Sequence, residues 1–283
     1  MSNVVRKSKQ ALGRSLGSIG VTKSNLQIAR LRKQFLPAKA GSVVNFAGYR
    51  IRITDGKSFY IQCKDEFVHQ IYRFEASRED PFIVDGGSNI GMSILYFKQL
   101  YPAARIVGFE PDPAVFKMLE ENIAANGIQN VRVRNAGLGA EDGVASFVPD
   151  NSAGGRIMSA AASIEVKVER LSQWIDQPVD FLKLNIEGEE LPVLQELERS
   201  GKLSQVRELV MEYHGWPTGE QRLGPILELL GRNGFRYLVH DFDSETGFAT
   251  KPPFSWDTEK TWYCLVYATN ISHAKTQRHK ENL

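Results

Sequence analysis

The stretch FIVDGGSNIG, residues 82–91, decides the fold of this chain. It begins as a continuous apolar run, which is typical of a strand buried on both faces of a sheet. It then turns through two glycines and opens the helical pattern of residues 89–100. Strand and helix patterns continue to alternate through residues 104–234, where Asp112-Pro113 predicts the start of one helix and Gly127 its end. The chain is therefore predicted to form an α/β fold, with a mostly parallel sheet covered by helices on both faces.

The segment before this stretch has a different pattern. Residues 25–36 predict a helix, which Pro37 ends. Residues 43–62 predict two or three strands, and Asp55-Gly56 between them favours a hairpin turn. We divide the chain into a basic, helical leader (1–40), a small β-rich subdomain (41–80), a main α/β domain with a β-rich insertion (81–270) and a C-terminal tail (271–283).

Composition places the chain among ordinary globular proteins. Of its 283 residues, 42% are hydrophobic and 24% are charged, which excludes a largely disordered or fibrous chain. No apolar run approaches the ~18 residues of a membrane-spanning helix. Cys63 and Cys264 lie far apart without a Cys-x-x-Cys spacing, which disfavours a disulfide scaffold and a thiolate zinc site. We therefore predict a cytoplasmic protein, with peripheral membrane contact as an open alternative.

Charge is distributed unevenly along the chain. Residues 1–54 contain eleven Lys and Arg residues and no Asp or Glu, which leaves the rest of the chain acidic. Such a leader is typical of a solvated helical extension, of an arm that docks on an anionic membrane or polymer, or of an organellar transit peptide. A secretory signal is disfavoured because Arg14 and several glycines interrupt the apolar stretch. The leader is expected to pack on the main domain, with peripheral contact to an anionic surface as the second interpretation.

The carboxyl ends of the predicted strands carry the residues with chemistry. In open parallel sheets, ligands bind at these ends, where the strand order reverses. Polar and glycine residues gather at five of them: Asp85-Gly86-Gly87-Ser88-Asn89, Glu110-Pro111-Asp112, Asn135-Ala136-Gly137, Asn185-Ile186-Glu187-Gly188 and Glu212-Tyr213-His214. Their common position predicts one binding site at this edge of the sheet.

The turn after the first strand predicts a cofactor that contains adenosine. Glycines let a ligand approach the backbone, and a helix start offers free N–H groups. Glu110 ends the next strand, where a carboxylate could accept both hydroxyls of a ribose. The dinucleotide pattern G-x-G-x-x-G fails because Ser88 replaces its second glycine, so we favour the phosphate-free S-adenosyl-L-methionine. The residues predicted to bind it are Asp85, Gly86, Gly87, Ser88, Asn89, Gly91, Glu110, Pro111, Asn135, Ala136 and Gly137.

Several blocks, in this order and spacing, resemble the FkbM family of S-adenosylmethionine-dependent methyltransferases. They are VDGGSNIG (84–91), GFEPDPAVFKMLEENIAANG (108–127), VRVRNAGLG (131–139), ERLSQWI (169–175), VDFLKLNIEGEELPVL (179–194) and ELVMEYH (208–214). The resemblance implies a class I, Rossmann-like methyltransferase fold of seven strands, with a closing antiparallel strand near residues 262–269. It also implies O-methylation, commonly of a sugar hydroxyl in a polysaccharide, glycolipid or natural product.

Two residues depart from the family pattern. Ser88 stands where the family usually has Ala, which adds a hydroxyl near the methionine part of the cofactor. Asn185 stands where the family block Lys-x-Asp-x-Glu-Gly has Asp. An amide cannot act as a general base and is a weaker ligand for a hard cation. A divalent metal is therefore not favoured, and no metal ligand is assigned.

Methyl transfer to an alcohol requires the removal of the hydroxyl proton. We expect a side chain at one of the strand ends to accept this proton. His214 or Glu187 is predicted to take this proton, with Glu212 as an orienting partner or as acceptor of a substrate hydroxyl. An unperturbed histidine, with a pKa of ~6.5, would give a rate that rises through about pH 6–7. Lys183 and Asn185, which share one face of their strand, complete the predicted catalytic set. The glycine-rich loop of residues 149–156 is expected either to close over the acceptor or to be an ordinary connection.

The acceptor is predicted to be a small molecule or a glycan. An N- or carboxyl-methyltransferase of the same fold stays open, because an amine nucleophile needs less base assistance. A non-catalytic S-adenosylmethionine-binding protein is the other alternative, although Gly87, Gly91 and Glu110 are intact. A nucleic acid acceptor is disfavoured, because the Asp/Asn-Pro-Pro-Tyr/Phe signature is absent and the basic residues gather in the leader.

Overall fold

The computed structural model describes residues 22–149, 156–157, 163–217, 220–240, 259 and 261–272. The first half of the predicted leader, most of the 149–156 loop and nearly all of the predicted C-terminal tail lie outside these ranges. None of the helices in these ranges has the length and apolar character that a membrane-spanning helix requires.

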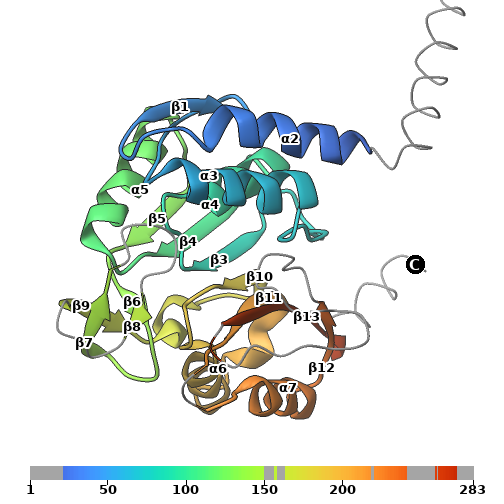
Figure 1. The fold of residues 1–283 in the computed structure, drawn as a ribbon. Coiled ribbons are helices and arrows are strands. Elements are labelled where there is room, and N and C mark those ends of the chain that lie inside the picture. Colours follow the sequence, from blue (N-terminus) through green and yellow to red (C-terminus); the bar gives the residue numbers. More distant parts are fainter. Residues whose placement is uncertain are drawn as a thin grey trace, which may run out of the picture.

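A seven-stranded sheet forms the centre of the described chain (Figure 1). In spatial order its strands are β12 (Phe235–His240), β13 (Trp262–Asn270), β11 (Val206–Gly215), β10 (Val179–Leu184), β3 (Phe82–Gly86), β4 (Arg105–Phe109) and β5 (Val131–Arg134). Strands β11, β10, β3, β4 and β5 run parallel, and β13 is antiparallel to both of its neighbours. The predicted α/β fold and its antiparallel closing strand are confirmed. The strand order reverses between β3 and β10.

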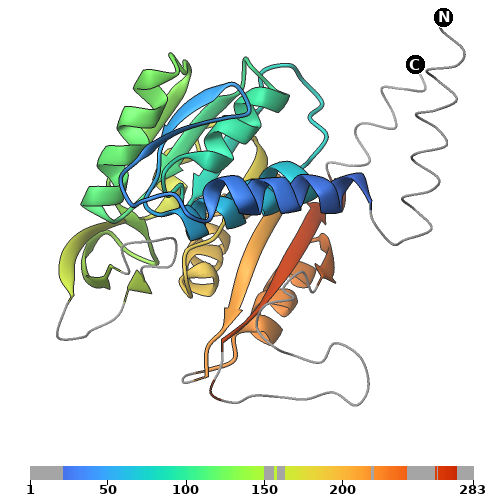
Figure 2. The ribbon, with the colours of Figure 1, turned by 45° about the horizontal axis from the view of Figure 1, so that its top comes forward.

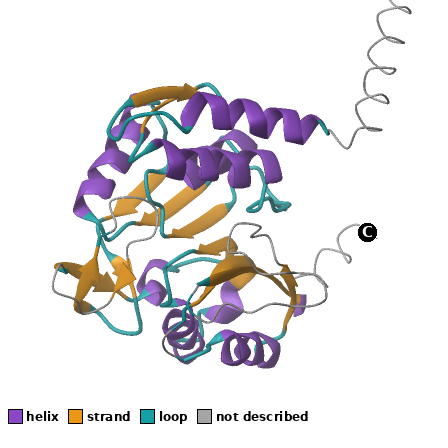
Figure 3. Ribbon diagram, in the orientation of Figure 1, coloured by secondary structure: helices purple, strands orange, loops and turns teal. Residues whose placement is uncertain are grey.

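Hydrophobic cores on both faces of the sheet explain its apolar strands. Alternate residues of β3 point to opposite faces, so Val84 joins one core and Ile83 the other. Helices α6 (Glu190–Arg199) and α7 (Leu223–Arg232) cover the first face, while α4 (Met92–Leu100) and α5 (Pro113–Ala125) cover the second. Figure 3 shows these two layers of helices with the strands between them.

A smaller sheet carries the predicted β-rich insertion. Its strands lie in the order β6 (Gly137–Leu138), β9 (Ile164–Glu169), β7 (Gly143–Val148) and β8 (Arg156–Ile157). A short 3-10 helix, Leu171–Trp174, then leads back to β10 of the main sheet. This sheet therefore joins the third and fourth parallel strands of the main sheet.

An N-terminal extension packs over α4 and α5 (Figure 2). It consists of α2 (Lys23–Phe35), a hairpin of β1 (Val43–Phe46) and β2 (Tyr49–Arg52), α3 (Gly56–Gln62) and a π-helix (Cys63–His69). Leu31 and Phe35 of α2 are buried in a core that also contains Phe59 of α3 and Met92 of α4. The helix predicted over residues 25–36 is confirmed.

The hairpin predicted at Asp55-Gly56 is wrong. Asp55 instead caps α3, because its Oδ1 accepts the N–H groups of Lys57 and Ser58. Gly56 is required at this position, since a Cβ would lie 2.3 Å from the carbonyl oxygen of Phe35. Asp side chains support helix starts as well as turns, and here the packing against the end of α2 selects the helix. In the described chain, the predicted β-rich subdomain is one hairpin followed by two helices.

Candidate active site

The glycine loop of residues 85–91 lies at the carboxyl end of β3, where the strand order reverses. The N–H groups of Gly87 and Ser88 both donate to the carbonyl oxygen of Phe109, at 3.0 and 2.8 Å. Gly87 has a φ of +82°, and a Cβ there would lie 1.9 Å from the carbonyl oxygen of Asn185. The loop is therefore held against the ends of β4 and β10, and this approach requires glycine.

Ser88, the residue that departs from the family pattern in this loop, turns its side chain inward. It is buried, and its Oγ donates to the carbonyl oxygen of Asp85 at 3.1 Å. The same Oγ would lie 2.5 Å from a Cβ at Gly108 of β4. The Ser88 hydroxyl, expected near the methionine part of the cofactor, therefore forms its hydrogen bond within the loop itself.

Glu110 directly follows β4 and faces the glycine loop. Its Oε2 accepts the N–H of Asn89, and its Oε1 accepts the N–H of Asp112, both at 2.9 Å. Burial raises the pKa of Glu110 to about 7. Each carboxylate oxygen keeps a second lone pair, which could accept a ribose hydroxyl.

The third predicted strand end joins the same region. The Nδ2 group of Asn135 donates hydrogen bonds to the carbonyl oxygens of Glu110 and Pro111, at 2.9 and 3.0 Å. Ala136 is buried and Gly137 begins β6. The structure therefore gathers the predicted cofactor residues around the carboxyl ends of β3, β4 and β5.

A buried ion pair lies beneath the glycine loop. Nζ of Lys183 is 2.9 Å from Oδ1 of Asp85 and donates to the carbonyl oxygen of Gly87 at 2.6 Å. Ser93 donates to Oδ2 of the same aspartate at 2.6 Å. Burial lowers the pKa of Lys183, but the charge and hydrogen bond of Asp85, together with the charges of Glu212 and Glu66, more than offset this effect, so the pKa is raised. Lys183 thus stays charged and acts as a positioning residue for the loop.

Glu212 of β11 extends this cluster toward the N-terminal extension. Its Oε1 accepts the hydroxyl hydrogen of Tyr72, and Nζ of Lys183 lies 5.4 Å from the centre of the Tyr72 ring. Burial raises the pKa of Glu212, while hydrogen bonds from Tyr72 and Asn185 and the charge of Lys183 oppose this rise. Sequence reasoning missed Tyr72, which lies 140 positions from Glu212 with no shared pattern.

Glu66 is a second residue of the site that sequence reasoning missed. It lies in the π-helix, is 6% exposed, and its Oε2 has no hydrogen-bond partner among the described residues. Burial raises its pKa well above the usual value, Lys183 opposes this shift, and Asp85 and Glu212 add to it. The shift favours the protonated carboxyl, which can donate a hydrogen bond. A π-helix departs from the usual helical period, so the direction of this side chain could not be predicted.

His214, at the end of β11, pairs with Glu187. Nε2 of His214 lies 3.3 Å from Oε2 of Glu187, a residue with an uncommon positive φ of 57°. The imidazole stacks on Trp216 with 5.5 Å between ring centroids, and it meets Tyr263 edge-on at 4.7 Å. Burial lowers the pKa of His214 to about 4, so its imidazole is neutral at physiological pH.

Two expectations for His214 need correction. The side chain of Glu212, predicted as an orienting partner or as acceptor of a substrate hydroxyl, is bonded to Tyr72, and Glu187 is the carboxylate beside the imidazole. Glu212 and His214 share a face of β11, but the loop after β10 places Glu187 next to the imidazole ring of His214. The usual histidine pKa of 6.5 also does not apply, because desolvation disfavours the charged imidazole.

Asn185 contributes an acceptor to the site. Its Oδ1 is buried and has no hydrogen-bond partner in the part of the chain that the structure describes. Across the same residues, no group of three or more metal-binding side chains lies together. A hydroxyl donor from a bound molecule would satisfy this amide oxygen.

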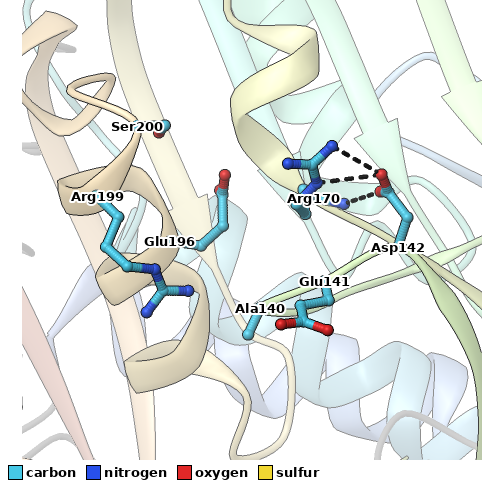
Figure 4. Close-up of a pocket in the computed structure, with 7 residues that line it drawn as sticks. All are labelled: Ala140, Glu141, Asp142, Arg170, Glu196, Arg199 and Ser200. Atoms are coloured by element: carbon cyan, nitrogen blue, oxygen red, sulfur yellow. Dashed lines mark hydrogen bonds and ion pairs between the residues drawn. The ribbon is translucent and has the colours of Figure 1, made fainter.

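A separate groove has no part in this arrangement (Figure 4). It is lined by Ala140, Glu141, Asp142, Arg170, Glu196, Arg199 and Ser200. Arg170 and Asp142 pair with each other at 3.0 Å, and Glu196 accepts the N–H of Ser172 at 3.2 Å. Since Arg170, Asp142 and Glu196 already have protein partners, we assign no ligand to the groove.

The order and direction of the strands define the class of protein. Numbered along the chain, the strands of the main sheet lie in the order 6-7-5-4-1-2-3, and the seventh is antiparallel. A glycine loop follows the first of these strands and a carboxylate ends the second. This arrangement is that of a class I, Rossmann-like methyltransferase.

Comparison with known proteins identifies the family. The chain belongs to the FkbM methyltransferase family, because residues 85–237 match the methyltransferase FkbM domain. Methyltransferase 1 of Beauveria bassiana is 30% identical over 187 residues, which cover 53% of this chain and 75% of that protein. The 2-O-methyltransferase NoeI of Sinorhizobium fredii is 26% identical over 181 residues, which cover 54% of this chain and 72% of that protein. The crystal structure of methyltransferase FkbM from Methylobacillus flagellatus KT aligns at a TM-score of 0.46 and 15% identity, over 90% of this chain and 60% of that one.

Proposed function

We propose that this protein transfers a methyl group from S-adenosyl-L-methionine to a hydroxyl group of a sugar, glycolipid, polysaccharide or natural product. The observation that carries the proposal is the meeting, at one edge of the sheet, of the glycine loop, Glu110 and the buried pair of His214 and Glu187. The relative named 2-O-methyltransferase NoeI supports oxygen as the methylated atom.

The backbone of the glycine loop fits a nucleoside without phosphates. The N–H groups of Gly87 and Ser88 donate to Phe109, that of Asn89 to Glu110, and that of Gly91 to Ser88. Dinucleotide sites bind a pyrophosphate through such N–H groups. Here these groups already donate to oxygens of the protein, so they are not available for a pyrophosphate. When bound, S-adenosylmethionine supplies a methyl group on a positively charged sulfur. Glu110 would hold its ribose through the free lone pairs of the carboxylate.

The chain's own residues would receive the acceptor hydroxyl and its proton. The neutral imidazole of His214 lies beside the carboxylate of Glu187, which stabilises the imidazolium that forms on protonation. Because Nε2 faces Oε2 of Glu187, this nitrogen carries the hydrogen of the neutral imidazole, and the acceptor proton would be taken up at Nδ1, which has no hydrogen-bond partner among the described residues. General-base assistance of this kind contributes a factor of ~10²–10⁴ to the rate.

The surroundings of this pair suit a polyhydroxylated acceptor. The half-buried ring of Trp216 lies against the imidazole and offers an apolar face for a sugar ring. Asn185 and Glu66 each bring a buried oxygen that has no hydrogen-bond partner among the described residues. Further hydroxyls of a sugar would supply the missing partners.

Incubation with isotopically labelled S-adenosylmethionine and an acceptor panel tests the proposal. The panel contains glycosides, glycolipids, peptides and polyamines, and mass spectrometry locates the added methyl group. We expect label on a hydroxyl of a glycoside or glycolipid. Label on a nitrogen or a carboxylate would contradict O-methylation, and the absence of S-adenosylmethionine binding by calorimetry would contradict the whole proposal.

Replacement of Glu110 by Ala is expected to weaken S-adenosylmethionine binding by about 1.5–3 kcal/mol, the contribution of hydrogen bonds to a charged group. Isothermal titration calorimetry measures the change. Glu196→Ala is a matched control, because Glu196 is also a buried carboxylate that accepts a backbone N–H but lies in α6, outside the glycine loop. Equal affinities of the Glu110 and Glu196 variants would remove Glu110 from the ribose site.

A further inference from the structure

Helix α2 has two different faces. Its inner face carries Leu31 and Phe35, which are 7% and 2% exposed and pack into the core of the N-terminal extension. The opposite face repeats at the spacing of a helix through Leu26, Ala29 and Lys33. Figure 1 shows α2 along the outside of the molecule, beside α3. The inner face meets α3 through Phe35 and Phe59, whose ring centroids lie 4.9 Å apart. The outer face therefore has no covering element in the described chain.

The outer face combines leucines with positive charge. Leu26, together with Leu36 just after the helix, is 40% exposed, and Ala29, Lys33 and Leu36 line a shallow depression with Arg32 and Pro37. Arg30 and Lys33 are exposed and make no ion pair with any residue that the structure describes. From Thr22 to Thr54 the sequence contains no acidic residue that could neutralise them.

We propose that the outer face of α2 docks on an anionic lipid surface. Basic side chains are attracted to anionic headgroups, and leucines on the same face can enter the boundary between headgroups and acyl chains. A nucleic acid or an acidic polysaccharide would use the charges but not the leucines. The proposal goes beyond methyl transfer, because none of the residues proposed for cofactor or acceptor binding lies on α2.

Sedimentation of the full chain with lipid vesicles tests this docking. The protein is expected to bind vesicles of phosphatidylcholine and phosphatidylglycerol, to leave vesicles of phosphatidylcholine alone unbound, and to lose binding as salt is raised. The double variant Arg30→Glu/Lys33→Glu should partition about 30-fold less onto the anionic vesicles. This factor follows because each basic residue near an anionic surface contributes roughly 1 kcal/mol to binding. The double variant Leu26→Ser/Leu36→Ser should also bind less, although its net charge is unchanged.

A second double variant controls for net charge. Arg199→Glu/Arg236→Glu changes the charge of the chain by the same amount on exposed residues of α6 and β12. It is expected to bind nearly as well as the natural chain. Affinity for S-adenosylhomocysteine and thermal melting report that each variant is folded.

Four results would overturn the proposal. The first is the absence of sedimentation with anionic vesicles. The second is an equal loss in the Arg199 and Arg236 control, which would show a general charge effect. The third is unchanged binding of both α2 variants, which would assign the contact to another segment. The fourth is unchanged binding of the leucine variant together with full competition by duplex DNA, which would assign this face to an anionic polymer.

Discussion

Replacement of Lys183 by Met is expected to destabilise the fold by about 3–5 kcal/mol, because it leaves a buried charge without its partner. The side chains of Lys183 and Asp85 are 3% and 0% exposed, and their charged atoms are 2.9 Å apart. Lys183 also donates to the carbonyl oxygen of Gly87, so the same change releases the glycine loop. Urea unfolding followed by circular dichroism measures the loss.

A double variant separates the charge effect from lost packing. Asp85→Asn/Lys183→Met removes both charges, and it should recover a large part of the stability lost in the single variant. Arg78→Met is the exposed counterpart, because the side chains of Arg78 and Asp80 are 48% and 44% exposed. Breaking that pair should change the stability far less, because solvent screens both charges. A Lys183 variant as stable as the natural chain would show that the ion pair does not support the fold.

Replacement of His214 by Ala is expected to lower turnover by ~10²-fold or more, with nearly unchanged affinity for S-adenosylmethionine. The expectation rests on the proposed function, in which the pair of His214 and Glu187 takes the acceptor proton. Transfer of labelled methyl to the best acceptor of the panel measures turnover, and calorimetry measures cofactor affinity. His240→Ala is the matched control, because His240 is an exposed histidine at the end of β12.

The pH dependence gives an independent test of the same residue. The imidazole must be neutral to accept a proton, and burial lowers its pKa to about 4. Activity that depends on His214 should therefore rise as pH increases through about 4 and show no inflection near the usual histidine value of 6.5. An inflection at the usual value that disappears in His214→Ala would show a solvated imidazole. Full turnover in that variant would show that the enzyme works by placing its acceptor in line.

The sequence alone determined where the buried strands lie along the chain and where some helices begin, because these features depend on residues that are neighbours in sequence. The apolar run 82–86 became the fully buried β3. Asp112 accepts the N–H groups of Ala114 and Val115 and begins α5, as its position before Pro113 predicts. The same local reasoning failed at Asp55-Gly56, where a helix cap and a hairpin turn share one sequence pattern. The contact between Gly56 and the end of α2 decided between them.

The sequence also predicted which residues stand at the strand ends, but only the tertiary structure decided their partners. Lys183 meets Asp85 because β10 and β3 pair in that register, with about a hundred residues of chain between the two. Tyr72 and Glu66 enter the site from an extension outside the matched family domain. Burial is likewise a property of the assembled layers, and it moves the pKa of His214 down and that of Glu110 up. Local patterns determine where a chain turns and which face it buries, whereas pairing and desolvation depend on segments that meet only in the folded molecule.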